Sequence, residues 1–244
     1  GEKLMLVGDP QQLKPVILLD ELTNRKLRRK YHVADEYDYR ENSIYKTYLA
    51  CDAVSDEILL RNHYRCNKKI IDFNNKKYYN SKLQVQSDSR ERQPLVYVNV
   101  DGGPGDMKNT SPAEVEEIMR YAGENPDKSI AVITPFVNQR ILIERGIKEN
   151  GFEHVVCGTV HAFQGDEKDV VLFSTALSDR TGKGTYDWLK NNKELINVAT
   201  SRAKDKLILL ADGKELERLH QGNEDDDLYE LVQYVKTNGE SKIT

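Results

Sequence analysis

Short apolar runs alternate with helical stretches from about the middle of this 244-residue chain onward. The apolar runs are Leu95–Val100, Ile130–Thr134, Val155–Val160, Val170–Thr175 and Leu207–Leu210. Strands that alternate with helices build βαβ units, in which helices cover a largely parallel sheet. The pattern therefore predicts an α/β fold with a largely parallel sheet flanked by helices.

Three helices are expected between these strands. For the first, Ser111 can cap, Pro112 suits the first helical position and Glu114 completes a capping box. The second is expected over Asn138–Glu149 and the third over Lys193–Ala203. These helices supply the crossovers of the predicted sheet.

The N-terminal part has a different pattern of apolar and charged residues. Leu4–Val7 is a short apolar strand candidate, and Asp20–Glu41 is highly charged with little apolar periodicity, so we expect it to be mobile. Strand patterns resume at Glu57–Leu60. We therefore place a domain boundary between an incomplete piece, residues 1–54, and a domain formed by residues 55–244.

The composition excludes several classes of protein. No apolar run approaches membrane-spanning length, and no charged and then apolar leader opens the chain. Cys51, Cys66 and Cys157 are far apart and lack metal-ligand or redox-pair spacing, which favours a reducing, cytoplasmic compartment and predicts no metal site. The formal charge of −4 argues against indiscriminate coating of nucleic acid, but it allows a local basic groove.

The segment GDPQQL begins at Gly8, after the first strand candidate. A strand that ends in Gly-Asp-Pro presents short polar side chains at the carboxyl edge of a sheet, where nucleotides bind in open α/β folds. Gln12 is then placed to sense a terminal phosphate. Taken alone, Gly-Asp-Pro would be interpreted as an ordinary turn, but Gln-Gln-Leu and Pro15 follow it and, together with the other motifs, favour the functional interpretation.

Two arginines suit phosphate chemistry. Arg65 follows an apolar run, and a guanidinium held by its surroundings neutralises charge on a transferred phosphoryl group. Arg202 lies at i+7 from Leu195 and i+3 from Ala199, on the apolar stripe of the third helix. Because an unpaired buried charge is costly, Arg202 needs an anionic partner, either a protein carboxylate or a phosphate.

Two loops follow predicted strands. In the first, Gly158 and Gly165 allow close backbone approach to a ligand. In the second, Pro135 ends a strand and Asn138 can cap the next helix, whose N-terminal amides favour a phosphate. Contacts to a phosphate backbone would make binding to a single strand largely independent of base sequence.

A phosphate-cradling loop is missing from the sequence. Such a loop ends in Gly-Lys-Ser/Thr, and the segment that comes nearest, Thr181-Gly-Lys-Gly-Thr185, has Gly184 in the hydroxyl position and Leu177 in place of the first glycine. A carboxylate pair that holds Mg²⁺ is expected upstream of Gly1, together with that loop.

Three separated segments, GDPQQL, HAFQGDEKD and NVATSRAKD, resemble in order and spacing the later motifs of superfamily 1 helicases, especially those of the Upf/Dna type. This resemblance implies a RecA-like fold that uses ATP with Mg²⁺. It assigns Gln12 and Arg65 to the γ-phosphate, Tyr64 to stacking on the base and Arg202 to the arginine finger. Cys66 departs from the family pattern, which has methionine at that position.

The same resemblance divides the remaining site residues into two groups. Gln164, Gly165 and Glu167 fall on the nucleotide side. The single-strand side comprises Thr134, Pro135, Gln139, Thr159 and His161. One loop, from residue 158 to residue 169, would thus connect the nucleotide with the strand.

These observations predict the C-terminal part of an ATP-dependent DNA or RNA helicase. Residues 1–54 would be the end of the first RecA-like domain and residues 55–244 the second, with the rest of the first domain and a single strand as partners. The fragment alone is expected to be inactive, since it supplies arginines without a phosphate cradle. The alternative is a non-catalytic nucleic-acid-binding or assembly module. DNA and RNA are not distinguished, and neither is the direction of movement.

Overall fold

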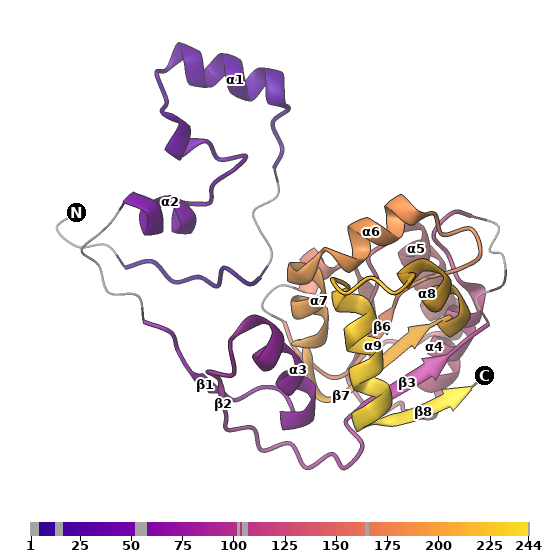
Figure 1. The fold of residues 1–244 in the computed structure, drawn as a ribbon. Coiled ribbons are helices and arrows are strands. Elements are labelled where there is room, and N and C mark those ends of the chain that lie inside the picture. Colours follow the sequence, from indigo (N-terminus) through magenta and orange to yellow (C-terminus); the bar gives the residue numbers. More distant parts are fainter. Residues whose placement is uncertain are drawn as a thin grey trace. The chain divides into compact units, whose positions relative to one another are not determined.

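The computed structural model describes residues 5–12, 17–51, 58–101, 103, 107–163 and 166–243. The chain folds into two compact units, Gly1–Leu60 and Arg61–Thr244. Figure 1 labels helices and strands of both units. The assignment of residues 1–54 and 55–244 to two motor domains stays a prediction.

Unit 1 contains helix α1 (Glu21–Lys30), the 3-10 turn η1 (Asp35–Tyr37) and helix α2 (Ile44–Cys51). Asp20 caps α1, because its Oδ1 accepts a hydrogen bond from Thr23 N at 2.9 Å. The charged segment that we expected to be mobile therefore forms a capped helix. Local polar contacts hold it where apolar periodicity is weak.

Two strands predicted in the N-terminal part are not found in the structure. Residues 5–7 and 58–60 have no strand conformation, while Leu4 and Glu57 lie outside the described residues. Met5 and Val7 are largely exposed. A strand needs a hydrogen-bonded neighbour, and the described part of unit 1 supplies none.

Unit 2 is built on a parallel sheet of six strands, in the spatial order β5-β4-β6-β7-β3-β8. The strands are β3 (Leu95–Asn99), β4 (Ile130–Ile133), β5 (Val155–Gly158), β6 (Lys168–Ser174), β7 (Ala203–Ala211) and β8 (Glu240–Ile243). The α/β fold and the five predicted strands are confirmed. The sequence pattern missed β8, whose side chains are mostly exposed.

Helices cover both faces of this sheet. On one face Val132, Leu172 and Ile208 pack with α4 (Pro112–Glu124) and α5 (Val137–Asn150) in one buried apolar cluster. The alternate strand residues point to the opposite face, where α9 (Asp227–Asn238) lies against β3 (Figure 1). The sheet is therefore buried on both sides, as parallel sheets generally are.

The remaining elements of unit 2 surround this sheet. They are β1 (Asn62–His63), α3 (Lys68–Tyr78), β2 (Gln84–Val85), η2 (Val160–Phe163), α6 (Lys183–Lys190), α7 (Lys193–Thr200) and α8 (Gly213–His220). β1 and β2 form a separate parallel pair. Among the described residues, no helix combines the length and the apolar character that crossing a bilayer requires.

Three details of the expected helix ends are corrected. Ser111 does cap α4, but the Glu114 carboxyl group binds the end of β6 instead of completing a capping box. Asn138 lies in the first turn of α5, whose N-cap is Phe136. Helix α7 ends at Thr200, so Arg202 follows the helix. In each case a tertiary contact or a turn competes with the local helix signal.

Candidate functional site

Arg65 lies in a tight turn between β1 and α3, and two contacts orient its guanidinium. Nε donates a hydrogen bond to Glu167 Oε2 at 2.7 Å, and Nη1 donates to Ser201 O at 3.3 Å. The Arg65 side chain is 29% exposed and that of Glu167 52% exposed. The guanidinium is thus oriented by the protein but remains accessible to a ligand.

Arg202 occupies the turn between α7 and β7 and is only 2% exposed. Its Nε donates to Val198 O and its Nη1 to Asp166 O, each at 3.4 Å. The predicted burial of Arg202 is therefore present, although the reason given for it was wrong. The connection to the next strand buries the side chain, not the apolar stripe of a helix.

The two guanidinium groups influence one another. Burial lowers the pKa of Arg202, and the positive charge of Arg65 lowers it further. Both effects disfavour the charged form of Arg202. An anion bound near both guanidinium groups would offset the repulsion between them. The pair is therefore suited to bind an anion such as a phosphoryl group.

A common backbone segment holds both arginines. Ser201 O accepts from Arg65 Nη1 and from Cys66 Sγ, the latter at 3.3 Å, and Lys204 O accepts from Asn67 N at 2.7 Å. Burial raises the pKa of the Cys66 thiol to about 12, so the thiol remains protonated and can donate. Cys66 thus joins the Arg65 turn to the segment that carries Arg202.

This arginine cluster lies at the amino edge of the sheet. Glu167 directly precedes β6 and Arg202 directly precedes β7, and these strands are neighbours. Thr134 and Thr159 instead follow the carboxyl ends of β4 and β5. Glu167 and Arg202, predicted for the nucleotide, therefore lie at the opposite end of the parallel strands from Thr134 and Thr159, which are predicted for the single strand.

The residues predicted to contact a single strand are largely enclosed. Thr134 and Gln139 are fully buried. The Gln139 amide accepts from Ser111 N at 2.8 Å and donates to Ser174 Oγ at 3.0 Å. Pro135 and Thr159 are half-buried. Their contact with a strand stays a prediction, and this conformation does not present Gln139 to one.

The other predicted residues are dispersed. Gln12 belongs to unit 1, where its Nε2 donates to Asp9 Oδ2 at 2.8 Å. Tyr64 is 68% exposed, so its ring is open to stacking. His161 lies in η2, but its side chain is outside the described structure, as are Gln164 and Gly165.

Sequence reasoning missed two parts of this site. The carbonyl groups of Ser201 and Asp166 bind the arginines, but backbone atoms leave no residue-type signal. His63 contacts the Arg65 turn, and its position beside the Tyr-Arg pair was the only available indication. No group of three or more potential metal ligands occurs among the residues that the structure describes.

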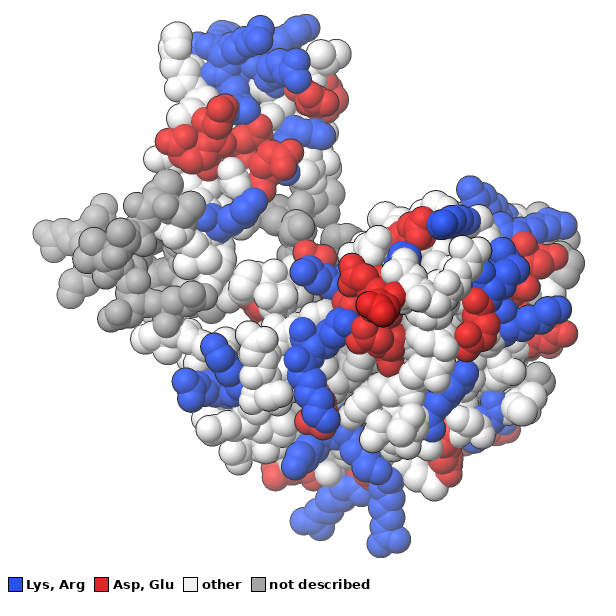
Figure 2. Space-filling view, in the orientation of Figure 1, with Lys and Arg blue, Asp and Glu red and all other residues white. Residues whose placement is uncertain are grey.

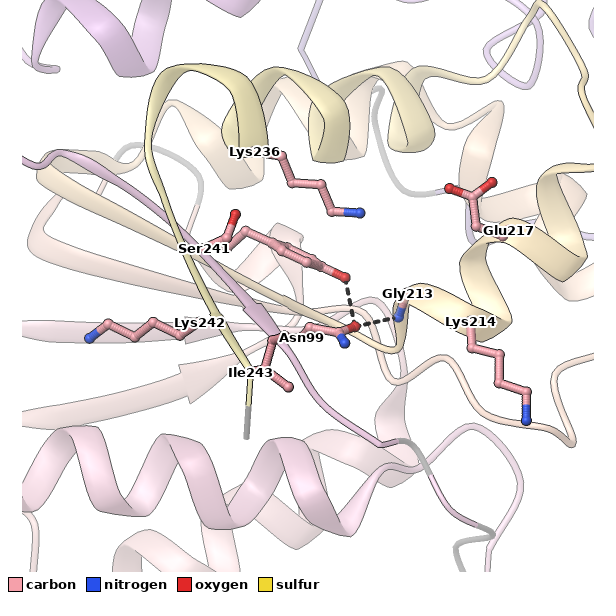
Figure 3. A pocket seen from close by; sticks show the side chains of 9 residues that line it. Asn99, Gly213, Lys214, Glu217, Lys236, Ser241, Lys242 and Ile243 are labelled. Atoms are coloured by element: carbon pink, nitrogen blue, oxygen red, sulfur yellow. Dashed lines mark hydrogen bonds between the residues drawn. The ribbon is translucent and has the colours of Figure 1, made fainter.

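A cavity of about 330 Å³ lies elsewhere in unit 2, between α8, α9, β3 and β8 (Figure 3). Lys214, Lys236 and Lys242 contribute to its lining. Gly213 N donates to Asn99 Oδ1 at 2.8 Å, and a Cβ atom at Gly213 would approach that oxygen to 2.7 Å. None of the predicted site residues lines this cavity.

Surface charge does not by itself locate a nucleic-acid path. Figure 2 shows basic and acidic side chains interspersed on the visible face of unit 2. Several lysines and arginines pair with neighbouring acids, as Lys77 does with Asp227 and Glu230. The contacts of individual side chains are therefore more informative about a binding site than the distribution of charge over the surface.

The chain is similar to proteins of known family. The AAA-domain family matches residues 40–214, which is more than half of the chain. The 3'-5' exoribonuclease HELZ2 of Mus musculus is 27% identical over 86% of this chain and 8% of its own length. RNA helicase Mov10l1 of Mus musculus is 27% identical, covering 97% of this chain and 22% of the relative.

The uncharacterized ATP-dependent helicase MJ0104 of Methanocaldococcus jannaschii is also 27% identical, covering 97% of this chain and 35% of the relative. The chain thus spans between 8% and 35% of the length of these three relatives. The chain belongs to the AAA-domain family, in which it is a C-terminal motor-domain segment of the superfamily 1 helicase type.

Proposed function

We propose that this chain forms the second RecA-like domain, preceded by the end of the first, of an enzyme that uses ATP hydrolysis to move along single-stranded DNA or RNA. The observation that carries the proposal is the arginine pair at the amino edge of the sheet. Arg65 and Arg202 are far apart in sequence, yet both are held at the segment from Val198 to Ser201.

The arginine pair would act on the transferred phosphoryl group. Phosphoryl transfer leaves negative charge on the equatorial oxygens, and fixed guanidinium groups stabilise that charge. In this proposal the Glu167 carboxylate, 2.7 Å from Arg65 Nε, occupies the position of an anion until ATP arrives. ATP binding would then exchange a protein carboxylate for a phosphate oxygen.

Other residues would complete the nucleotide site. Tyr64 is exposed beside Arg65 and would stack on the base, while Gln164 and Gly165 would approach the nucleotide from the neighbouring loop. The phosphate cradle and the Mg²⁺ ligands would come from the preceding part of the first RecA-like domain. Gln12, in unit 1, would then sense the γ-phosphate.

The strand would bind at the opposite edge. Thr134, Pro135 and Gln139 follow β4, and Thr159 and His161 follow β5. Opening and closing of the nucleotide cleft would change the grip at this edge through the loop that joins β5 to β6. We further propose a cytoplasmic location, because Cys66 and Cys157 are free thiols.

The test is ATP turnover by the full-length protein with and without a single-stranded oligonucleotide. We expect turnover to depend on the strand, and Arg65→Ala to reduce it by at least about a hundredfold. Arg120→Ala is the matched control, because Arg120 also pairs with an exposed acid, Glu124, but lies on α4, away from the proposed nucleotide and strand contacts. Strand binding without any turnover would contradict the motor and support a non-catalytic binding module.

A further inference from the structure

We infer that His63 is a positioning residue that holds Arg65 in the orientation required for phosphate contact, an inference that rests on the proposed function. His63 ends β1 and directly precedes Tyr64 and Arg65. Its Nε2 accepts a hydrogen bond from Cys66 N at 3.0 Å. A side chain that binds a backbone amide three residues later closes a turn, and Tyr64 and Arg65 are the residues inside it.

The turn is anchored on both sides. Before it, Gln84 N donates to Arg61 O and Gln86 N donates to His63 O, each at 2.7 Å, which fixes β1 against β2. After it, Asn67 N donates to Lys204 O at 2.7 Å. Between these anchors, the His63 ring supplies the bond that closes the turn.

The same bond requires a neutral imidazole. Nε2 accepts only when it carries no proton, so the proton must lie on Nδ1. Burial, and then the charge of Arg65, lowers the pKa of His63 to about 4. His63 therefore remains an acceptor at physiological pH, and its ring adds no further positive charge to the arginine cluster.

Two substitutions separate positioning from simple packing. His63→Gln keeps an acceptor oxygen at a similar reach, whereas His63→Leu keeps apolar bulk and removes the acceptor. In the full-length protein we expect His63→Leu to lower kcat for ATP hydrolysis between about tenfold and a hundredfold, because a small displacement of a catalytic group has a large effect. The KM for ATP should change by a smaller factor than kcat, since the other proposed contacts to ATP retain most of the ground-state binding. His63→Gln should keep most of the wild-type kcat.

His154→Leu is the matched control. His154 is also half-buried, and its Nε2 forms a hydrogen bond with Ala122 O of α4 at 3.2 Å, away from the arginine cluster. Its replacement should leave kcat unchanged. A wild-type kcat in His63→Leu, with Arg65→Ala impaired, would overturn the inference. Equal losses in His63→Leu and His63→Gln would do so as well, because packing and not the acceptor would then be responsible.

Nuclear magnetic resonance on the 244-residue chain tests the positioning without turnover. We expect the His63 imidazole shifts to report an unprotonated Nε2. His63→Leu should accelerate exchange of the Cys66 amide and move the Arg65 Nε resonance, whereas His63→Gln should change neither. If the wild type has no ATPase activity but these shifts occur, the proposed function fails and the positioning role stands. Unchanged Cys66 and Arg65 signals in His63→Leu would reject the positioning role itself.

Discussion

Arg202 shows how one residue combines a structural and a proposed catalytic role. In the full-length protein we expect Arg202→Ala to lower turnover on the order of a thousandfold with a much smaller loss of nucleotide affinity, because an arginine finger acts on charge that develops in the transition state. Arg202→Lys should restore little, since an ammonium cannot reproduce the planar fork. Turnover and nucleotide affinity, measured on the same variants, check this prediction.

The melting temperature of the Arg202→Ala variant separates a loss of catalysis from a loss of stability. The side chain is 2% exposed and donates to two carbonyl groups, so its loss should also destabilise the fold by about 1–3 kcal/mol. Arg65→Ala should reduce turnover with less destabilisation, because Arg65 is more exposed. Near-normal turnover of Arg202→Ala together with a large drop in melting temperature would reject the finger assignment.

Glu114 makes stability depend on pH. Burial raises the pKa of its carboxyl to about 8 from an ordinary 4.5, although Ser174 Oγ and Ala176 N donate to it. The folded state therefore binds this proton more tightly than the unfolded state. The stabilisation of the folded state by this protonated carboxyl group is complete below about pH 4.5 and is lost as the pH rises through about 8.

We expect Glu114→Gln to remove this pH dependence of the free energy of unfolding. At its steepest, the contribution of Glu114 changes by about 1.4 kcal/mol per pH unit. Urea unfolding of both proteins between pH 5 and 8, roughly the interval between the two pKa values, measures the difference in slope. Glu116→Gln, an exposed residue on the same helix, should leave the slope unchanged. Parallel stability curves for wild type and Glu114→Gln would show that Glu114 stays ionised.

At the level of single elements, the C-terminus of α5 depends on a glycine. Gly151 caps the helix with φ of 67° and ψ of 31°, and its N–H donates to Lys148 O. We expect Gly151→Ala to destabilise unit 2 by about 1–2 kcal/mol, because an L side chain is strained in the left-handed region. Thermal or urea unfolding measures the change.

Gly184 offers the matched control for Gly151. It lies inside α6 without a positive φ, and an added Cβ would meet nothing within 4 Å. Gly184→Ala should therefore be neutral or stabilise by up to about 1 kcal/mol. A similar loss for both variants would contradict the explanation by backbone strain at Gly151.

For the whole molecule, we expect hydrogen exchange to be much faster in residues 1–53 than in the central strand β6. The described part of unit 1 buries few side chains, whereas β6 is flanked by β4 and β7. Amides that are protected only by local contacts exchange through local unfolding, which costs less free energy than unfolding of the whole domain. Protection in residues 5–12 equal to that of β6 would show that this segment belongs to the core of the second domain.

The βαβ pattern was predictable because it is local. Runs such as Ile130–Thr134 are apolar on both faces, and Ser111 followed by Pro112 marks a helix start whatever surrounds it. Arg65 and Arg202 could be proposed as phosphate ligands for a similar reason, since phosphate chemistry needs arginines of defined geometry. These features depend on residue type and short spacing alone, whereas the roles of the other motif residues were implied by the resemblance to superfamily 1 helicases.

Long-range contacts decided the rest. Glu114 matches a capping box, yet Ser174 and Ala176 donate to its carboxyl group, and Gln139 is enclosed between Ser111 and Ser174. Packing of α3 against α7 brings Arg65 and Arg202 to one segment, where each donates to carbonyl oxygens that every residue possesses. Residue type predicted which side chains suit a phosphate. Only the tertiary structure could decide that they meet at the amino edge of the sheet, because backbone acceptors and long-range packing carry no signal in the local sequence.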